Sequence, residues 1–137
     1  MTTAVDTSVL LDLIARESEH QDAAAVALAQ ARKKGSIIVC EVVYAELAAA
    51  FKGDQKRVDA FLHAAGITLS HSPAEALAHA GKLWQSYRDR GGPRIRILPD
   101  FLVGGHALNE ADELLTRDRG FFRESFKKLR VVDPSKE

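Results

Sequence analysis

The sequence contains only one cysteine, Cys40, which excludes an intrachain disulfide and any metal site built from several cysteines. A lone cysteine fits a reducing compartment, so we expect a cytoplasmic protein. The N-terminus lacks a basic segment followed by a long apolar core, and no run approaches about 20 apolar residues. We therefore expect neither a signal peptide nor a membrane span.

An excess of charge of one sign is also missing, because 19 basic residues balance 19 acidic residues. Without a global basic field, any binding of nucleic acid must use local patches. The 137 residues are 46% hydrophobic and 28% charged, which predicts a folded chain with a real core. Repeats, low-complexity segments and linkers are absent from the sequence, so we expect one domain over residues 1–137.

Short apolar runs alternate with stretches of helical periodicity, which predicts an α/β fold with a central parallel sheet of four to five strands. Helices should cover both faces of such a sheet. The predicted strands are the run before Asp6, Ser36–Val39, Ile67–Leu69, Glu113–Thr116 and Leu129–Val132. One predicted helix begins directly after Asp6, and the others cover about 22–34, 41–51, 55–65, 73–90, 99–109 and 120–126. The segment 94–98 is ambiguous between a loop and a small strand.

Asp6 stands where the first predicted strand leaves the sheet and a helix begins. Thr7 or Ser8 is a suitable N-cap for that helix, because a hydroxyl can accept from a free backbone N–H. Ligand sites of open α/β sheets form at the carboxyl ends of strands, which makes Asp6 a candidate site residue. The alternative is that Asp6 only helps to cap the helix.

Glu46 falls within an apolar stripe that includes Val43 and Leu47. An ionised carboxylate without a partner in that position would cost several kcal/mol or raise its pKa. We therefore expect Glu46 to face a cation, a hydrogen-bonding partner or the edge of a cleft. The alternative is an edge position from which the carboxylate reaches water.

Two further acids occupy the C-terminal half. Asp100 opens a predicted helix as its N-cap, and Gly104–Gly105 predicts close packing or binding along that helix, or a tight helix–helix contact. Asp118 follows a predicted strand between Arg117 and Arg119. A solvated charge cluster is the alternative interpretation of Asp118.

The carboxyl ends of parallel strands meet at one edge, so these four acids can converge in one crevice. Close carboxylates repel one another unless a divalent cation neutralises them, and a set of oxygen ligands suits Mg²⁺ or Mn²⁺. The matching chemistry is metal-assisted hydrolysis of a phosphodiester. In such a site Thr7 and Thr116 could orient an acid or a water, Ser8 could support Asp6, and Arg117 or Arg119 could hold a phosphate.

Four motifs in this order resemble the PIN domain, and specifically the VapC-type toxins of toxin–antitoxin pairs. They are Val5-Asp6-Thr7-Ser8, Glu46-Leu47, Asp100-Phe101-Leu102-Val103-Gly104, and Leu115-Thr116-Arg117-Asp118 with Phe121 or Phe122 behind it. The resemblance covers essentially the whole chain. Cys40 departs from the pattern where Ser or Thr is usual, and Gly104–Gly105 stands where alanine is usual.

The resemblance implies a three-layer α/β/α domain with the activity of a magnesium- or manganese-dependent endoribonuclease. It implies Asp6, Glu46, Asp100 and Asp118 as catalytic metal ligands, the first three being the more regular positions of the family. It also implies a cognate VapB-type antitoxin that blocks the site, an RNA substrate and a toxin homodimer.

Competing functions remain open at this point. A haloacid-dehalogenase-like phosphatase needs a second acid two residues after the first, where this chain has Ser8. A receiver-like domain needs paired early acids and a late lysine that the sequence does not offer. A catalytically weak PIN-like binding module is the non-enzyme alternative.

His106 is expected to be a partner-contacting or surface residue. The basic clusters at residues 88–96 and 117–130 are expected to be solvated faces or borders of the crevice.

Overall fold

A computed structural model describes residues 1–15, 17–93 and 96–135. Five strands form one sheet in the order β3-β2-β1-β4-β5, and each neighbouring pair is parallel. The predicted parallel sheet is therefore confirmed, with five strands. They are β1 (Thr2–Val5), β2 (Ser36–Val39), β3 (Ile67–Leu69), β4 (Glu113–Leu115) and β5 (Val131–Val132).

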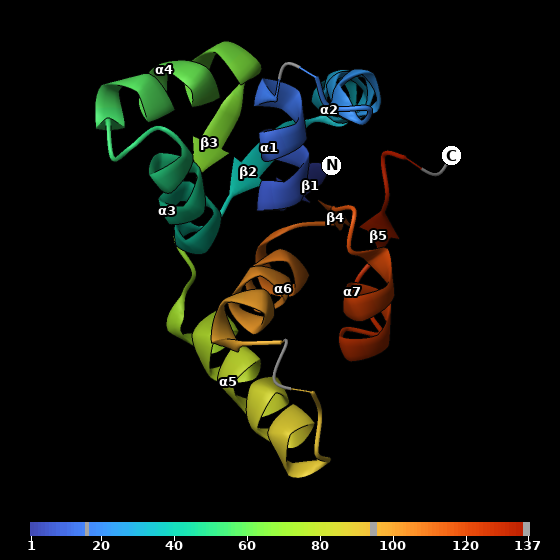
Figure 1. Cartoon of the computed structure of the whole chain (residues 1–137). Helices are drawn as coiled ribbons and strands as arrows, with labels where there is room; N and C mark the ends of the chain where they lie inside the picture. Colours follow the sequence, from blue (N-terminus) through green and yellow to red (C-terminus); the bar gives the residue numbers. More distant parts are fainter. Residues whose placement is uncertain (16, 94–95, 136–137) are drawn as a thin grey trace.

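Seven helices in the described residues connect and flank these strands: α1 (Thr7–Ile14), α2 (Gln21–Lys34), α3 (Glu41–Ala50), α4 (Gln55–Ala65), α5 (Ala74–Asp89), α6 (Leu98–Glu110) and α7 (Arg119–Ser125). Figure 1 shows α1–α4 in the half of the molecule that holds β1–β3, and α5–α7 in the other half. The connections from β1 to β2 and from β2 to β3 carry α1–α4, whereas those from β3 to β4 and from β4 to β5 run in the opposite direction across the sheet and carry α5–α7. Because crossovers between parallel strands are right-handed, the two sets of helices lie on opposite faces. The fold is thus the predicted three-layer arrangement. Among the described residues, no helix has the length and apolarity that crossing a bilayer demands.

The core follows from the apolar runs that predicted the strands. All three residues of β4 are buried, and so are Ala4 and Val5 of β1, because helices cover the central strands. On the α6–α7 side the packing is aromatic: the rings of Phe101 and Phe121 meet edge to face with centroids 5.3 Å apart. Phe126 joins the same cluster and is 2% exposed.

The register of β1 and β4 decides where the acids go. Val5 pairs with Leu115, so both strands end at the same edge of the sheet. The backbone N–H of Asp6 donates to the carbonyl of Leu115 at 2.9 Å, which continues the ladder by one bond beyond the strands. Asp6 and Thr116, which are 110 positions apart, consequently leave the sheet side by side.

Gly104 and Gly105 permit a tight helix contact, which confirms one of the two explanations for this pair. A Cβ on Gly104 would lie 2.3 Å from the Phe126 ring. A Cβ on Gly105 would lie 2.9 Å from the carbonyl oxygen of Ala76 and 3.0 Å from the Cβ of Ala80. The glycines therefore let α6 approach α5 and the aromatic cluster closely.

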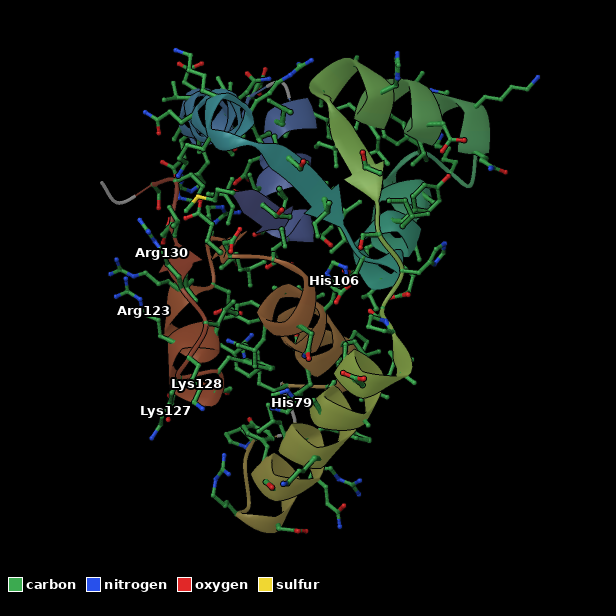
Figure 2. All side chains as sticks on the ribbon, turned by 180° about the vertical axis from the view of Figure 1, so that it is seen from behind. His79, His106, Arg123, Lys127, Lys128 and Arg130 are labelled. Carbon is green, nitrogen blue, oxygen red and sulfur yellow. The ribbon has the colours of Figure 1, made fainter. Side chains whose placement is uncertain are left out.

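The expectation that His106 lies at the surface is wrong. Its side chain is 1% exposed, within α6, and its Nε2 lies 3.2 Å from the hydroxyl of Ser70 (Figure 2). Burial lowers the pKa of His106, because the charged imidazolium loses its hydration. Residues 94–95 of the ambiguous segment lie outside the described part of the chain, and Ile97 directly precedes α6 as its N-cap.

The contact at Gly104 yields a stability test. We expect Gly104→Ala to lower the free energy of unfolding by about 1–3 kcal/mol, because the new methyl group overlaps Phe126. Gly81→Ala in α5 is the matched control: nothing lies within 4 Å of its added Cβ, so better helix propensity should raise stability by roughly 1 kcal/mol. Urea unfolding of both variants measures the difference, and equal effects would contradict the close approach.

Candidate functional site

Asp6 is itself the N-cap of α1. Its Oδ1 accepts from the backbone N–H of Thr7 at 2.8 Å, so the prediction that Thr7 or Ser8 caps the helix is wrong. A carboxylate can fill this role because the first turn of a helix presents free N–H groups and a positive dipole end. The two hydroxyls are thereby left available for other residues of the site.

Thr116 connects the two strand ends through its hydroxyl. Its Oγ1 donates to Oδ2 of Asp6 at 2.7 Å and accepts from the backbone N–H of Asp118 at 3.0 Å. Because Thr116 is fully buried, this pair of bonds fixes both acids relative to the sheet.

Glu46 lies at the exposed margin of α3 rather than within its buried stripe, which is formed by Val43 and Leu47. The hydroxyl of Thr7 donates to Oε1 of Glu46 at 2.7 Å. The expectation of a hydrogen-bonding partner for Glu46 is therefore confirmed. This bond ties α3 to the start of α1 and brings the second acid to the edge where Asp6 stands.

Asp118 faces the same edge but is engaged by a cation. Arg96 pairs with it through both terminal nitrogens, with Nη2 3.1 Å from Oδ1, and the guanidinium lies 4.4 Å from the centre of the Phe121 ring. The hydrogen bond to Asp118 raises the pKa of Arg96, which stays charged. The carboxylate of Asp118 remains 38% exposed.

Asp100 occupies the third position of α6, not the N-cap that the sequence predicted. Its Oδ2 accepts from the backbone N–H of Ile97 at 3.0 Å and so satisfies one free donor at the helix start. The helix begins at Leu98, one residue before the predicted start, and Pro99 fits its first turn, where no N–H donor is needed. The negative charge of Asp100 adds to that of Asp118 in raising the pKa of Arg96.

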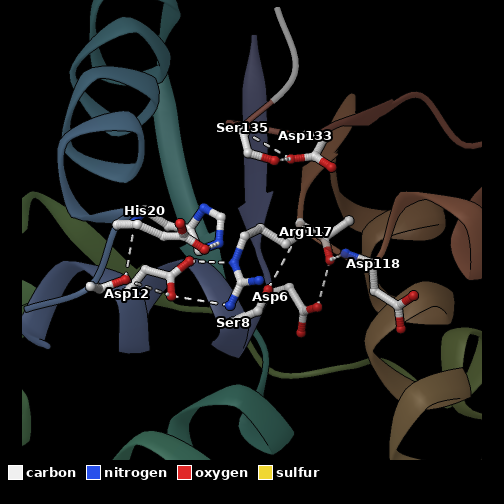
Figure 3. A network of polar contacts seen from close by, with 11 residues as sticks. Asp6, Ser8, Asp12, His20, Arg117, Asp118, Asp133 and Ser135 are labelled. Carbon is white, nitrogen blue, oxygen red and sulfur yellow. Dashed lines mark hydrogen bonds and ion pairs between the residues drawn. The ribbon is translucent and has the colours of Figure 1, made fainter.

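Arg117 turns away from the four acids, and Figure 3 shows it reaching toward Asp12 of α1. Both Nε and Nη2 contact that carboxylate, the latter at 3.1 Å from Oδ1. The backbone N–H of Arg117 donates to the hydroxyl of Ser8 at 3.3 Å. Asp12 was not singled out from the sequence, since one acid in a short helix carries no signal of a partner 105 positions away.

The start of α3 holds another polar cluster, which the sequence did not predict. Glu41 accepts from the backbone N–H of Ser72 at 2.9 Å and from its hydroxyl, and these bonds lower the pKa of Glu41 against the effect of partial burial. Cys40, the N-cap beside it, is 2% exposed, and burial raises the pKa of its thiol to about 11. Such a thiol is inert, so Cys40 has a packing role rather than a chemical one.

The electrostatics single out Asp6. Desolvation in its surroundings raises the pKa of Asp6, and the hydrogen bonds from Thr116 and Thr7 oppose that rise. The negative charges of Glu46 and Asp118 add to it. Asp6 is thus an acid whose charged form is disfavoured by burial and by the charges of Glu46 and Asp118.

The donor set fits a hard divalent cation. Carboxylate oxygens with mutual repulsion are the ligands that Mg²⁺ or Mn²⁺ prefers, and a bound cation would relieve the strain on Asp6. Within residues 1–15, 17–93 and 96–135, however, no three acid, histidine or cysteine side chains are already gathered around one point. Asp118 and Asp100 instead use their oxygens on Arg96 and Ile97, so an ion would have to compete with those partners.

The disfavoured charge of Asp6 predicts a pH-dependent stability difference. We expect metal-free Asp6→Asn to melt a few degrees above the wild type at neutral pH, because the amide removes the buried charge and its repulsions. The folded-state pKa of Asp6 lies above the ordinary 3.8, so as the pH falls the folded protein binds a proton before the unfolded chain does. The wild type therefore loses stability as the pH rises from 3.8 through the folded-state pKa of Asp6.

The advantage of the variant should therefore shrink as the pH falls toward 3.8. Thermal unfolding in chelator across this range measures it. A variant that is less stable than the wild type at every pH would show that the hydrogen bonds of Asp6 outweigh its charge repulsion.

Comparison with solved structures gives full-length matches. VapBC-1 from nontypeable Haemophilus influenzae matches with a TM-score of 0.78 at 20% identity, covering 99% of this chain and 100% of the other. VapBC2 from Rickettsia felis, bound to a promoter DNA fragment, matches at 0.75 and 21%, covering 97% and 98%. A toxin–antitoxin complex from Klebsiella pneumoniae matches at 0.61 and 21%, covering 96% and 97%.

At these identities the structural matches establish a shared fold. A search of curated proteins finds no match. The sequence profile of the PIN domain, in contrast, matches residues 3–127, which include all four candidate acids, strands β2, β3 and β4, and all of β1 except Thr2. The chain therefore belongs to the PIN domain family.

Proposed function

We propose that this protein is a magnesium- or manganese-dependent endoribonuclease that acts as the toxin of a toxin–antitoxin pair. The observation that carries the proposal is the arrangement around Asp6: a desolvated carboxylate, held by Thr116 at the edge of the sheet, with the charges of Glu46 and Asp118 acting on it. Membership of a family whose members are generally nucleases supports the same activity. The proposal treats residues 1–137 as one functional domain.

In this proposal Asp6 is the central ligand, and Glu46, Asp100 and Asp118 complete the set. When bound, the divalent ion supplies charge neutralisation and Lewis-acid activation for displacement at phosphorus. Release of Asp118 from Arg96 would free its carboxylate for the ion. The same guanidinium would then be available for a substrate phosphate, which it suits through its planar pair of donors.

The hydroxyl residues act by holding the acids. Thr116 fixes Oδ2 of Asp6, whose Oδ1 accepts from the Thr7 N–H, and the Thr7 hydroxyl fixes Oε1 of Glu46. Ser8 receives the backbone N–H of Arg117, and the Arg117–Asp12 pair anchors the segment between β4 and α7. These residues are positioning residues, and the involvement of Arg117 is through Asp12 rather than through a phosphate.

A nuclease assay tests the activity. We expect the wild type to cleave structured RNA with Mn²⁺ or Mg²⁺ and to stop in chelator. Asp6→Asn should lower kcat/KM by about a hundredfold or more, since charge stabilisation by a metal ion is worth several kcal/mol. Asp89→Asn, at the exposed end of α5, is the matched acid-to-amide control and should cleave normally.

Metal binding has its own readout. Added Mn²⁺ should raise the melting temperature of the wild type and of Asp89→Asn more than that of Asp6→Asn, because binding to the folded state stabilises it. Cleavage that persists in chelator, or cleavage by Asp6→Asn equal to that of the wild type, would contradict the metal-nuclease proposal.

A binding module is the second candidate function. The engagement of Asp118 by Arg96 and of Asp100 by Ile97 favours it, because both acids are occupied within the chain. Under this alternative the protein binds RNA in the presence of metal and leaves it intact in the same assay.

The toxin role also requires an antitoxin. A structural match that is a toxin–antitoxin complex supports a VapB-type partner, and we propose a homodimer of this chain as the toxin unit. Co-expression with the small reading frame next to the gene should yield a complex in which RNA cleavage is suppressed, and light scattering of the free protein should give twice the mass of the chain. Failure of any neighbouring product to bind and inhibit would remove the toxin role while leaving the nuclease intact.

A further inference from the structure

A basic groove runs between α7 and β5, on the side of the sheet that ends in the edge strand. It has a volume of about 730 Å³, its floor includes Val131 and Val132, and its cationic walls are formed by Arg119, Arg123, Lys127 and Arg130. Figure 2 shows Arg123, Lys127, Lys128 and Arg130 pointing outward on one side of the molecule. We call this feature the α7–β5 groove.

The charge of this groove is not balanced locally. Residues 119–130 contain five cations and a single acid, Glu124, although the whole chain is neutral. In the part of the chain that the structure describes, Arg119, Arg123 and Lys127 form no ion pair, whereas Arg130 lies 3.5 Å from Glu113. Asp133, the acid among the residues that line the groove, accepts from the backbone N–H and the hydroxyl of Ser135 at 2.9 and 2.6 Å.

Protection of an edge strand does not account for so many cations. Charged residues on an edge discourage pairing with another chain, but β5 has only two residues and is already too short to offer a long template. Three cations that have no ion-pair partner among the described residues instead keep a strong local positive potential around the groove, which attracts a polyanion.

The groove begins one residue after a candidate site acid, Asp118. Arg119 opens α7 directly after Asp118, whose backbone N–H is held by Thr116. The seven-residue helix extends about 10 Å from that point, and Lys127 and Arg130 continue the row beyond its end. A chain of phosphates that enters the acidic edge can therefore continue along these cations.

We propose that the α7–β5 groove binds the phosphodiester backbone of single-stranded RNA that flanks the cleaved bond; this rests on the proposed ribonuclease function. The contacts are to phosphates, so they position the RNA without reading its bases. The acids at the edge of the sheet then bind the metal, and the groove provides the affinity for the RNA substrate.

Salt-dependent binding tests the groove separately from catalysis. The test protein carries Asp6→Asn and is kept in chelator, so that RNA is bound but not cut. Arg123→Gln with Lys127→Gln is compared with Lys33→Gln with Lys56→Gln, which changes the net charge equally at exposed positions of α2 and α4. Fluorescence anisotropy follows a labelled unstructured RNA of about 16 nucleotides from about 50 to 200 mM salt.

We expect the groove variant to bind on the order of tenfold more weakly near 0.1 M salt, with a slope of log K against log salt shallower by about 1.4, which corresponds to two lost phosphate contacts. The control pair should keep the slope of the parent. Circular dichroism and melting temperatures must agree among the proteins. Equal slopes for the two pairs would overturn the groove, and so would tighter binding of polyglutamate than of RNA, which would assign the groove to an acidic protein.

The two proposals fail in different ways. If the groove variant loses affinity for RNA while the wild type cuts no RNA with any metal, RNA binding by the groove is supported and the nuclease proposal is wrong. If the wild type cuts RNA while the groove variant binds with the parental slope, the nuclease stands and the groove falls.

Discussion

The pairing of β1 with β4 is the constraint on which the site depends. It joins the first strand of the chain to the fourth and is continued by the bond from the Asp6 N–H to the Leu115 carbonyl. One residue further, the Thr116 hydroxyl reaches the Asp6 carboxylate. A slip of one residue in this register would turn the side chains of a strand to the opposite face. The buried strands on both sides of the pair oppose such a slip, so the hydrophobic core sets the geometry of the acids.

This geometry concentrates negative charge that the protein must then manage. Each acid at the edge has a donor from the chain: Thr116 for Asp6, Thr7 for Glu46, Arg96 for Asp118 and the Ile97 N–H for Asp100. Asp6 still carries a raised pKa, because its two hydrogen bonds do not offset burial and repulsion. A bound cation would therefore stabilise the charged form of Asp6. Functional sites within stable folds commonly hold residues in such unfavourable states. Arg96 supplies a positive charge beside Asp118. Its contact with the Phe121 ring connects the acidic edge to the aromatic packing of α6 and α7.

The neutral composition hides a strong separation of charge. Acids collect at the carboxyl edge of the sheet, and a row of cations starts immediately beside them on α7. Averaged over the chain these cancel, but at short range they do not, because charges separated by more than about 10 Å are largely screened in salt. A net charge of zero therefore excluded a general affinity for polyanions and left open a local one.

The sequence by itself determined the parallel sheet and most helix and strand limits, because apolar periodicity, caps and glycine stops are local signals that each element carries in its own residues. The four acids are candidate site residues that it predicted. It also predicted a partner for Glu46 from the neighbouring Val43 and Leu47; the Thr7 hydroxyl is that partner, although Glu46 lies at the exposed margin of α3. Only the tertiary structure decided which partner each polar group has. Asp6 caps its own helix, Arg117 binds Asp12, His106 is buried against Ser70, and Asp118 is held by Arg96. Three of these contacts join residues 22 to 105 positions apart, and no periodic pattern encodes such a distance; they exist because the sheet brings the strand ends together and the helices pack around them.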